Sequence, residues 1–119
     1  MKYCWTTIIV EDLDASIAFY RDIVGLPVNR RYNAGPDVEI TFLGAGETQI
    51  ELIRRSGGPA VIGDGMVLGF AVESLDETLA FIADHGIMVE SGPFQPNDHV
   101  KFFYVLDPNG VKVQFSESM

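Results

Sequence analysis

Glu51 is a carboxylate set among apolar residues, and it could act as an acid, a base or half of an ion pair. A carboxylate that is partly removed from water is costly unless it is paired or protonated. Pairing with Lys112 would make a structural ion pair, whereas an unpaired Glu51 could abstract a proton next to a carbonyl. That reaction needs an oxyanion stabiliser, for which the candidates are Lys112, Gln114 and Tyr104. Both roles stay open at this point.

Alternation of apolar and polar residues predicts which side chains share a face of a strand. In three strands the apolar residues are expected to pack against a helix: Ile50 and Leu52; Val38, Ile40 and Phe42; Val111, Val113 and Phe115. The polar residues between them are then expected on the opposite face: Glu39, Thr41, Gln49, Glu51, Lys112 and Gln114. If the two sheets curl and join edge to edge, this face lines a concave cup. Otherwise it is the solvated side of two sheets.

An internal repeat organises these strands. Residues 10–22 align with residues 72–84, and seven of the thirteen positions are identical. The match continues after a shift of one residue, since Gly25-Leu26-Pro27-Val28 corresponds to Gly86-Ile87-Met88-Val89. Two copies are too few for a solenoid. The repeat therefore predicts one pseudo-symmetric domain over residues 1–119, made of modules 1–54 and 65–119 with a linker at 55–64.

Each copy reads as a strand, a helix and three further strands, which predicts an α+β fold with helices outside curled mixed sheets. The strands are expected at 3–10, 28–32, 38–43 and 48–54 in the first copy, and the last three of the second copy at 88–90, 100–106 and 111–116. Apolar residues at helical spacing predict one helix per copy, with Asp12 and Ser74 as N-caps. Gly25 and Gly86 are expected to adopt the left-handed conformation that ends a helix. His85 is expected at the end of the second helix, where the helix dipole favours a cation.

The composition limits the class of partner. Seventeen Asp and Glu against eight Lys and Arg give a net charge of −9, which argues against a nucleic-acid-binding surface. The single cysteine, Cys4, cannot build a disulfide framework and is expected to pack on the helix-facing side of the first strand. No apolar run reaches the roughly 20 residues of a membrane helix, and the N-terminus lacks a signal-peptide pattern. We therefore expect a cytoplasmic protein that binds neither nucleic acid nor membrane.

The sequence resembles the vicinal oxygen chelate superfamily, which includes glyoxalase I, the extradiol dioxygenases, and the fosfomycin and bleomycin resistance proteins. The segments that carry the resemblance are 10–20, 25–28, 50–52 and 103–110, the last of which reads Phe-Tyr-Val-Leu-Asp-Pro-Asn-Gly. The resemblance covers essentially the whole chain. It implies paired βαβββ modules that curl into a cup, usually in homodimers, with each cup of the glyoxalase-like members completed by two chains.

The resemblance also implies where a divalent metal would bind. The metalloenzymes of the superfamily hold the ion with four ligands, commonly two His and two Glu, and the ion polarises vicinal oxygens of the substrate. The four positions fall on Trp5, Glu51, Val67 and Gln114. An indole and an isopropyl group cannot coordinate a metal, so no cofactor is expected. A divalent metal stays open through a ligand such as His99, from the loop over residues 92–99.

Without a metal, the same positions describe a pocket for an organic ligand. Trp5 offers a flat apolar surface for stacking, and Phe102 and Tyr104 face the cup by analogy with the fosfomycin-type members. Alternatively, these three aromatic side chains pack in the floor of the cup or at a dimer interface. The side chains expected to contact a ligand are Trp5, Thr7, Glu39, Thr41, Glu51, Val67, His99, Phe102, Tyr104, Lys112 and Gln114. Trp5 favours an aromatic ligand, and Glu39 and Glu51 favour a cationic one.

Three functions are compatible with this pattern. The preferred one is a metal-free protein that binds or sequesters a small molecule, in the manner of the bleomycin resistance proteins. The second is a divalent-metal lyase of the glyoxalase I type. The third is a metal-free lyase or isomerase in which Glu51 is the catalytic base.

Overall fold

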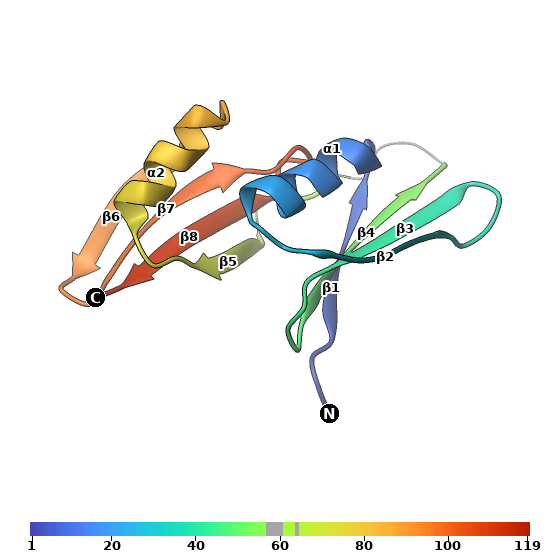
Figure 1. The fold of residues 1–119 in the computed structure, drawn as a ribbon, viewed down its shortest axis with the longest axis horizontal. Coiled ribbons are helices and arrows are strands. Elements are labelled where there is room, and N and C mark those ends of the chain that lie inside the picture. The colour runs from blue at the N-terminus through green and yellow to red at the C-terminus, as the bar shows by residue number, and fades with distance from the viewer. Residues whose placement is uncertain (57–60, 64) are drawn as a thin grey trace. The chain divides into compact units, whose positions relative to one another are not determined.

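The chain folds into two units, Met1–Val61 and Ile62–Met119 (Figure 1). The computed structural model describes all residues except 57–60 and 64, so this part of the predicted linker lies outside the described residues. Each unit contains one copy of the repeat, with a helix against one face of a four-stranded sheet. The predicted α+β fold of two βαβββ modules is confirmed.

The sheet of the first unit has the strand order β1-β4-β3-β2. The elements are β1 (Trp5–Val10), α1 (Leu13–Ala18), η1 (Phe19–Ile23), β2 (Val28–Asn33), β3 (Val38–Leu43) and β4 (Gln49–Arg55). β1 runs parallel to β4, and the other neighbours are antiparallel. Asp12 caps α1 as predicted, because its Oδ1 accepts the N–H of Ala15 at 3.0 Å. Cys4 precedes β1 and is exposed, so the prediction that it packs against the helix is wrong.

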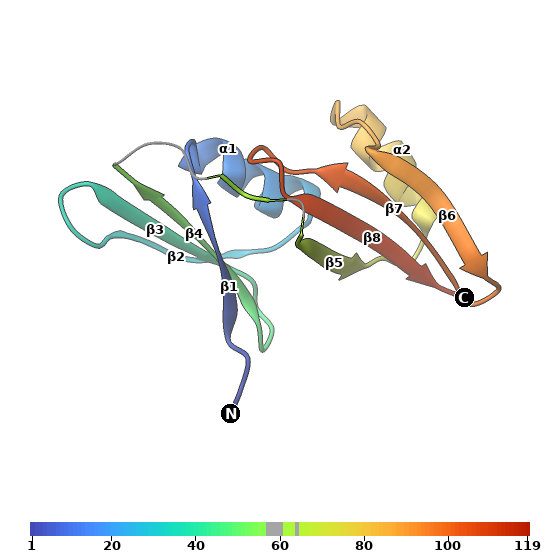
Figure 2. The same cartoon turned by 180° about the vertical axis from the view of Figure 1, so that it is seen from behind.

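The sheet of the second unit has the corresponding order β5-β8-β7-β6. The elements are β5 (Val67–Ala71), α2 (Leu75–Asp84), β6 (Ser91–Asn97), β7 (Val100–Leu106) and β8 (Lys112–Ser118). α2 lies in front of this sheet in Figure 1 and behind it in Figure 2. Ser74 caps α2 as predicted, since its Oγ accepts the N–H of Glu77 at 3.2 Å. Neither helix, nor any other in the described part of the chain, is long and apolar enough to cross a membrane.

The helices of the two units end differently. α2 is regular up to Asp84, whereas α1 continues into the π-helical turn η1. The N–H of Leu26 donates to the carbonyl of Tyr20 at 2.9 Å, and the N–H of Ile87 donates to that of Ile82 at 2.9 Å. These bonds correspond in the repeat, yet the first spans six residues and the second five. The wider π-helical turn therefore accommodates the one-residue shift between the copies.

β6 corrects the predicted strand at residues 88–90. The strand starts at Ser91 and runs through the segment expected to be a loop, up to Asn97. Pro93 and Pro96 lie within it, and a proline cannot donate to a ladder of hydrogen bonds. β6 tolerates them because it is the edge strand, paired irregularly with β7 alone.

β3 corrects the predicted assignment of faces. Phe42 is paired with Glu51, and Thr41 is paired with Leu52, so Thr41 lies on the helix-covered face. Glu39 lies there as well, since Arg31 ion-pairs with both Glu39 and Asp14 of α1. Alternation could not identify the buried face because residues 40–43 are all buried. Glu39 and Thr41 therefore do not share the face of Glu51.

Replacing Thr41 with valine is expected to stabilise the chain by about 1 kcal/mol. Thr41 is fully buried, and its Oγ1 has no hydrogen-bond partner among the described residues. A buried hydroxyl without a partner costs about 1–3 kcal/mol, and valine keeps the shape of the side chain. Urea unfolding of both proteins measures the difference. The control is Thr7→Val, whose lost hydroxyl donates to Glu51, and which should be destabilised. A destabilised Thr41→Val would contradict the prediction.

Candidate functional site

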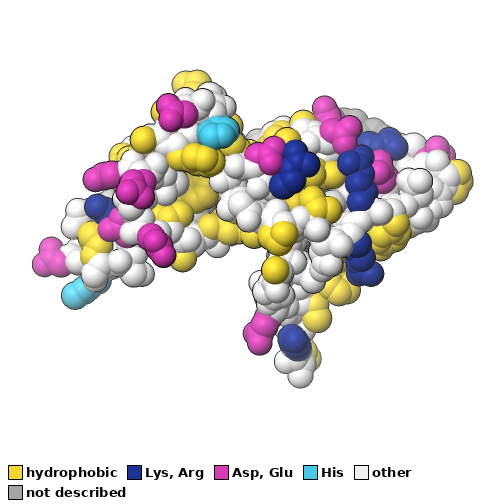
Figure 3. Space-filling view, viewed as in Figure 1, with side chains coloured by type: hydrophobic (Ala, Val, Ile, Leu, Met, Phe, Trp, Pro, Cys, Tyr) yellow, Lys and Arg dark blue, Asp and Glu magenta, His cyan; other side chains and the backbone are white. Residues whose placement is uncertain are grey.

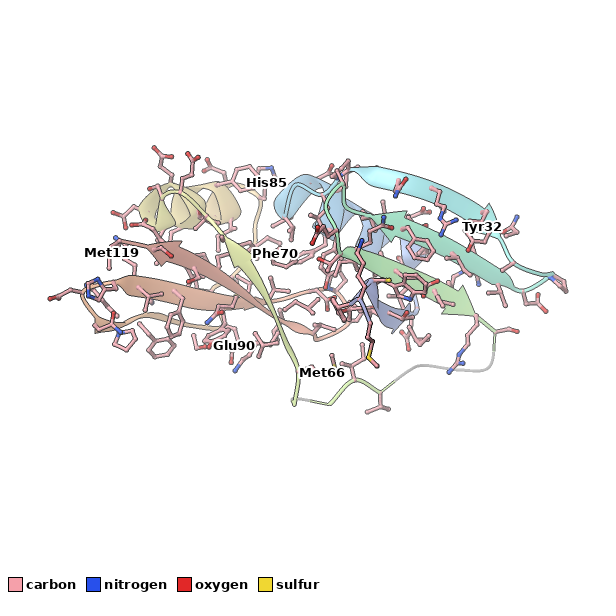
Figure 4. The ribbon with its side chains drawn as sticks, turned by 90° about the horizontal axis from the view of Figure 1, so that it is seen from below. Tyr32, Met66, Phe70, His85, Glu90 and Met119 are labelled. Carbon is pink, nitrogen blue, oxygen red and sulfur yellow. The ribbon has the colours of Figure 1, made fainter. Side chains whose placement is uncertain are left out.

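The face of the first sheet opposite α1 carries a row of four chemically different side chains. The strand register places them side by side, one from each strand: Arg30 (β2), Phe42 (β3), Glu51 (β4) and Thr7 (β1). Directly paired residues point to the same side of a sheet, so a cation, an aromatic ring, a carboxylate and a hydroxyl are neighbours in that order. We call this set the cross-sheet row. Figure 4 shows the side chains of this unit, with Tyr32 of β2 labelled.

Glu51 is the carboxylate of the cross-sheet row, and it is 9% exposed. Thr7 Oγ1 donates a hydrogen bond of 2.5 Å to its Oε1. Lys112, predicted as an ion-pair partner of Glu51, has an acidic partner in its own unit, because its Nζ lies 3.7 Å from Glu90 Oε2. Glu51 is thus stabilised by a neutral donor of its own sheet, and the carboxylate stays available as an acceptor.

Two further aromatic side chains, those of Trp5 and Tyr32, lie next to members of the cross-sheet row. Trp5 is 49% exposed, and its ring meets Phe42 edge-on with centroids 5.5 Å apart. Phe42 is buried, and the Arg30 guanidinium lies 4.3 Å from its ring centroid and 5.6 Å from that of Tyr32. Trp5 therefore presents about half of its surface beside Phe42. The spacing Arg30-x-Tyr32 could have revealed this stack, but the reversed faces of β3 concealed it.

The second unit carries a separate group of aromatic and polar side chains on the face opposite α2. The register pairs Val67 with Lys112 and Gln114 with Tyr104, and Phe102 lies two residues from Tyr104 on the same face. Gln114 Nε2 donates to Tyr104 Oη at 3.3 Å, and Lys112 Nζ lies 4.8 Å from the Tyr104 ring centroid. The alternation predicted for this face is confirmed, since Val111, Val113 and Phe115 are buried on the other side.

Phe94 of β6 extends this aromatic group and was missed. Its ring centroid lies 5.8 Å from that of Phe102 and 6.3 Å from that of Tyr104. The signal in the sequence was weak, because Phe94 stands between Pro93 and Gln95-Pro96 in a segment that resembles a loop. This face of the second sheet therefore combines three aromatic rings with an amide and an ammonium group.

The residues at the four expected metal positions do not fit a divalent ion. Trp5 and Val67 have no metal-ligating atom, and Gln114 and Glu51 already form hydrogen bonds. His99 lies in the exposed turn between β6 and β7, where its backbone N–H donates to Asn97 Oδ1. The described residues include no group of three or more His, Cys, Asp or Glu that could hold a metal. The described side chains of the cross-sheet row, and separately those of the second unit's aromatic group, offer stacking, ion pairing and hydrogen bonding.

The charge of the chain is unevenly divided between the units. Residues 1–61 carry six Lys and Arg and eight Asp and Glu, a net charge of −2, whereas residues 62–119 carry two and nine, a net charge of −7. Figure 3 shows acidic side chains around α2 and most of the basic ones over the first unit. The strong overall acidity is therefore mainly a property of the second unit.

Comparisons with known proteins agree with this fold. The model of the Glyoxalase/Bleomycin resistance protein/Dioxygenase superfamily matches residues 2–115. A probable lactoylglutathione lyase of Synechocystis sp. is 32% identical over 123 aligned positions, covering 95% of this chain and 92% of that protein. Trypanothione-dependent glyoxalase I of Leishmania major is 25% identical, with a TM-score of 0.82 and coverage of 97% and 85%. TnmS3, an antibiotic binding protein of Streptomyces, shares the fold at 16% identity, with a TM-score of 0.80 and coverage of 100% and 97%.

Proposed function

The chain belongs to the glyoxalase/bleomycin resistance protein/dioxygenase superfamily, and from this membership we propose that it is a metal-free protein that binds a ring-bearing small molecule. The observation that carries the proposal is Trp5. A half-exposed indole stands where the superfamily pattern places its first metal ligand, edge-on to Phe42. Exposed aromatic side chains next to a hydrogen-bonded carboxylate suit the recognition of a planar ligand with polar substituents.

A divalent-metal lyase is the second candidate, and the Synechocystis relative, a probable lactoylglutathione lyase, favours it. The donor set opposes it, because Trp5 and Val67 offer no lone pair to an ion at neutral pH. A metal-free reaction with Glu51 as base is weaker still. One of the two oxygens of the Glu51 carboxylate is already engaged by the hydrogen bond from Thr7.

We also propose that the protein acts in the cytoplasm as a homodimer. β2 and β6 support a dimer, because each is an edge strand of its sheet and nearly all of its residues are exposed. An unpaired edge is a ready template for pairing with another chain.

The test of the proposed function measures metal content and turnover together. The purified chain is expected to hold far less than one equivalent of nickel, zinc or manganese. After each metal is added, it is expected to leave the adduct of methylglyoxal and glutathione unchanged. Elemental analysis and the absorbance of the thioester product measure these quantities. A stoichiometric metal that Glu51→Gln removes, or turnover with any of the three metals, would establish the lyase instead.

Binding itself is measured through the one tryptophan of the chain. Its indole N–H gives a single signal in a ¹H–¹⁵N spectrum, and 3-phenylpropan-1-ol in the millimolar range is expected to shift it. Glu51→Gln should change the affinity by less than about tenfold, because glutamine keeps the shape and one acceptor oxygen. Glu39→Gln, on the helix-covered face, is the matched control. An unmoved indole signal at saturating concentrations of ring-bearing probes would refute the proposal.

A further inference from the structure

Neighbouring arginines on β2 have opposite surroundings. Arg31 forms two ion pairs on the helix-covered face. Its Nε lies 2.6 Å from Glu39 Oε2, and its Nη2 lies 2.9 Å from Asp14 Oδ1. The hydrogen bond from Arg31 also lowers the pKa of Glu39. Arg30, on the other face, forms no ion pair or hydrogen bond with any described residue. Among the residues that the structure describes, no carboxylate pairs with the Arg30 guanidinium and no acceptor takes its N–H groups.

Stacking orients the free guanidinium. Arg30 Cζ lies 4.3 Å from the centroid of Phe42, and Tyr32 borders it on β2 at 5.6 Å. A guanidinium held against an aromatic face keeps its N–H groups at its edge, where they can bind a carboxylate with two parallel hydrogen bonds. Part of the side-chain entropy is lost in this stack before any ligand binds, which favours binding.

The cross-sheet row sets the size of a ligand that could use Arg30. Neighbouring strands lie about 4.8 Å apart, so the backbones of Arg30 and Glu51, two strands apart, are separated by about 10 Å. A single ring with a short side chain spans this distance. Its carboxylate would reach Arg30, its ring would lie against the exposed indole of Trp5, and a polar substituent would donate to Glu51.

We propose that Arg30 binds the carboxylate of this ring-bearing ligand, which makes the ligand an aromatic organic acid. The inference rests on the proposed function and specifies its ligand class. A cationic ligand was expected because Glu39 and Glu51 were placed on one face. Glu39 lies on the other face, paired with Arg31, and the charged residue that shares the cross-sheet row with Glu51 is Arg30. The first unit, with a net charge of −2, opposes an anion far less than the whole chain would.

Three probes of equal shape test the sign of the charge: 3-phenylpropionate, 3-phenylpropan-1-ol and 3-phenylpropylamine. The indole N–H signal of Trp5 is followed during each titration at low salt. The acid is expected to bind at least tenfold more tightly than the alcohol, and the amine no more tightly than the alcohol. Equal affinities, or tighter binding of the amine, would overturn the role of Arg30 but leave the binding function intact. Binding of none of them would overturn both.

Variants of the two neighbouring arginines assign the effect to one side chain. Arg30→Met should weaken binding of the acid about tenfold and leave the affinity of the alcohol within twofold. Arg30→Lys keeps the charge but lacks the planar fork, so it should recover only part of the loss. Arg31→Met, a control on the opposite face, should leave both affinities within twofold. Equal losses for acid and alcohol in Arg30→Met, in a variant with native circular dichroism, would show a packing role and contradict the proposal.

Discussion

Replacing Trp5 with alanine is expected to weaken binding of 3-phenylpropionate by about 30-fold or more. Buried aromatic anchors at binding sites commonly contribute about 2 kcal/mol or more. Trp5 is half exposed and contacts Phe42 through its edge, so a ligand ring can cover the remaining indole surface. Isothermal titration calorimetry measures the loss, since the variant lacks the indole signal.

Phe81→Ala is the matched control for Trp5→Ala. Phe81 is a 40% exposed aromatic residue of α2 in the second unit, and its ring lies tilted against that of His85. Its replacement should leave the affinity unchanged. Trp5→Phe should retain much of the affinity, because a smaller ring still covers Phe42. If Trp5→Ala binds the acid as tightly as the parent chain, Trp5 serves packing alone.

Asp107→Ala is expected to lower the free energy of unfolding by about 3 kcal/mol. Asp107 is 5% exposed in the turn that joins β7 to β8, and its Oδ1 accepts the backbone N–H groups of Asn109 and Val111, both at 2.8 Å. Alanine leaves these donors without their acceptor, and hydrogen bonds to a charged group contribute about 1.5–3 kcal/mol each. The midpoint of urea unfolding reports the change.

Asp98→Ala is the control that distinguishes the loss of the Asp107 hydrogen bonds from the general effect of removing one negative charge. Asp98 is an exposed residue of the turn between β6 and β7, and its replacement should change stability by less than about 0.5 kcal/mol. Asp107→Asn keeps one acceptor oxygen, so its loss of unfolding free energy should lie between those of Asp107→Ala and Asp98→Ala. A loss below 1 kcal/mol for Asp107→Ala would mean that water or the backbone replaces the carboxylate.

The fold could be predicted from the sequence because local and long-range signals agreed. The repeat gave two βαβββ modules, and Asp12 and Ser74 cap the helices that follow them. The helix caps depend on a few neighbouring residues, and the repeat is a comparison of the sequence with itself. Both can therefore be recognised without knowing what packs against each segment. Strand β3 matches its predicted bounds, Val38–Leu43, for the same reason.

The face of β3 and the position of β6 could not be predicted, because both depend on neighbouring strands. Residues 40–43 are buried on both faces, and only the pairing of Phe42 with Glu51 identifies the face that they share. β6 contains two prolines, which a strand accepts only at an edge. The order of strands in a sheet is a property of the folded chain, so the residue pattern of each segment alone misassigned both.

The candidate site was predicted in part. Alternation placed Glu51 opposite the helix, and Lys112, Gln114 and Tyr104 share a face in the second unit. Arg30 was missed because a lone arginine in an exposed strand carries no signal until its partners are known. The Phe42 ring beneath its guanidinium, and the lack of an ion-pair partner for it among the described residues, are visible only in three dimensions.

The turn η1 is also the place where the two copies of the repeat differ in length. If both halves descend from one duplicated ancestor, they now differ in length by one residue at this point. Ile23 and Val24 lie between Asp22 and Gly25, whereas only His85 lies between Asp84 and Gly86. The extra residue changed the closing hydrogen bond from five residues to six, while the glycine kept its left-handed conformation in both copies. The π-helical turn at the end of the first helix thus accommodates the extra residue before Gly25.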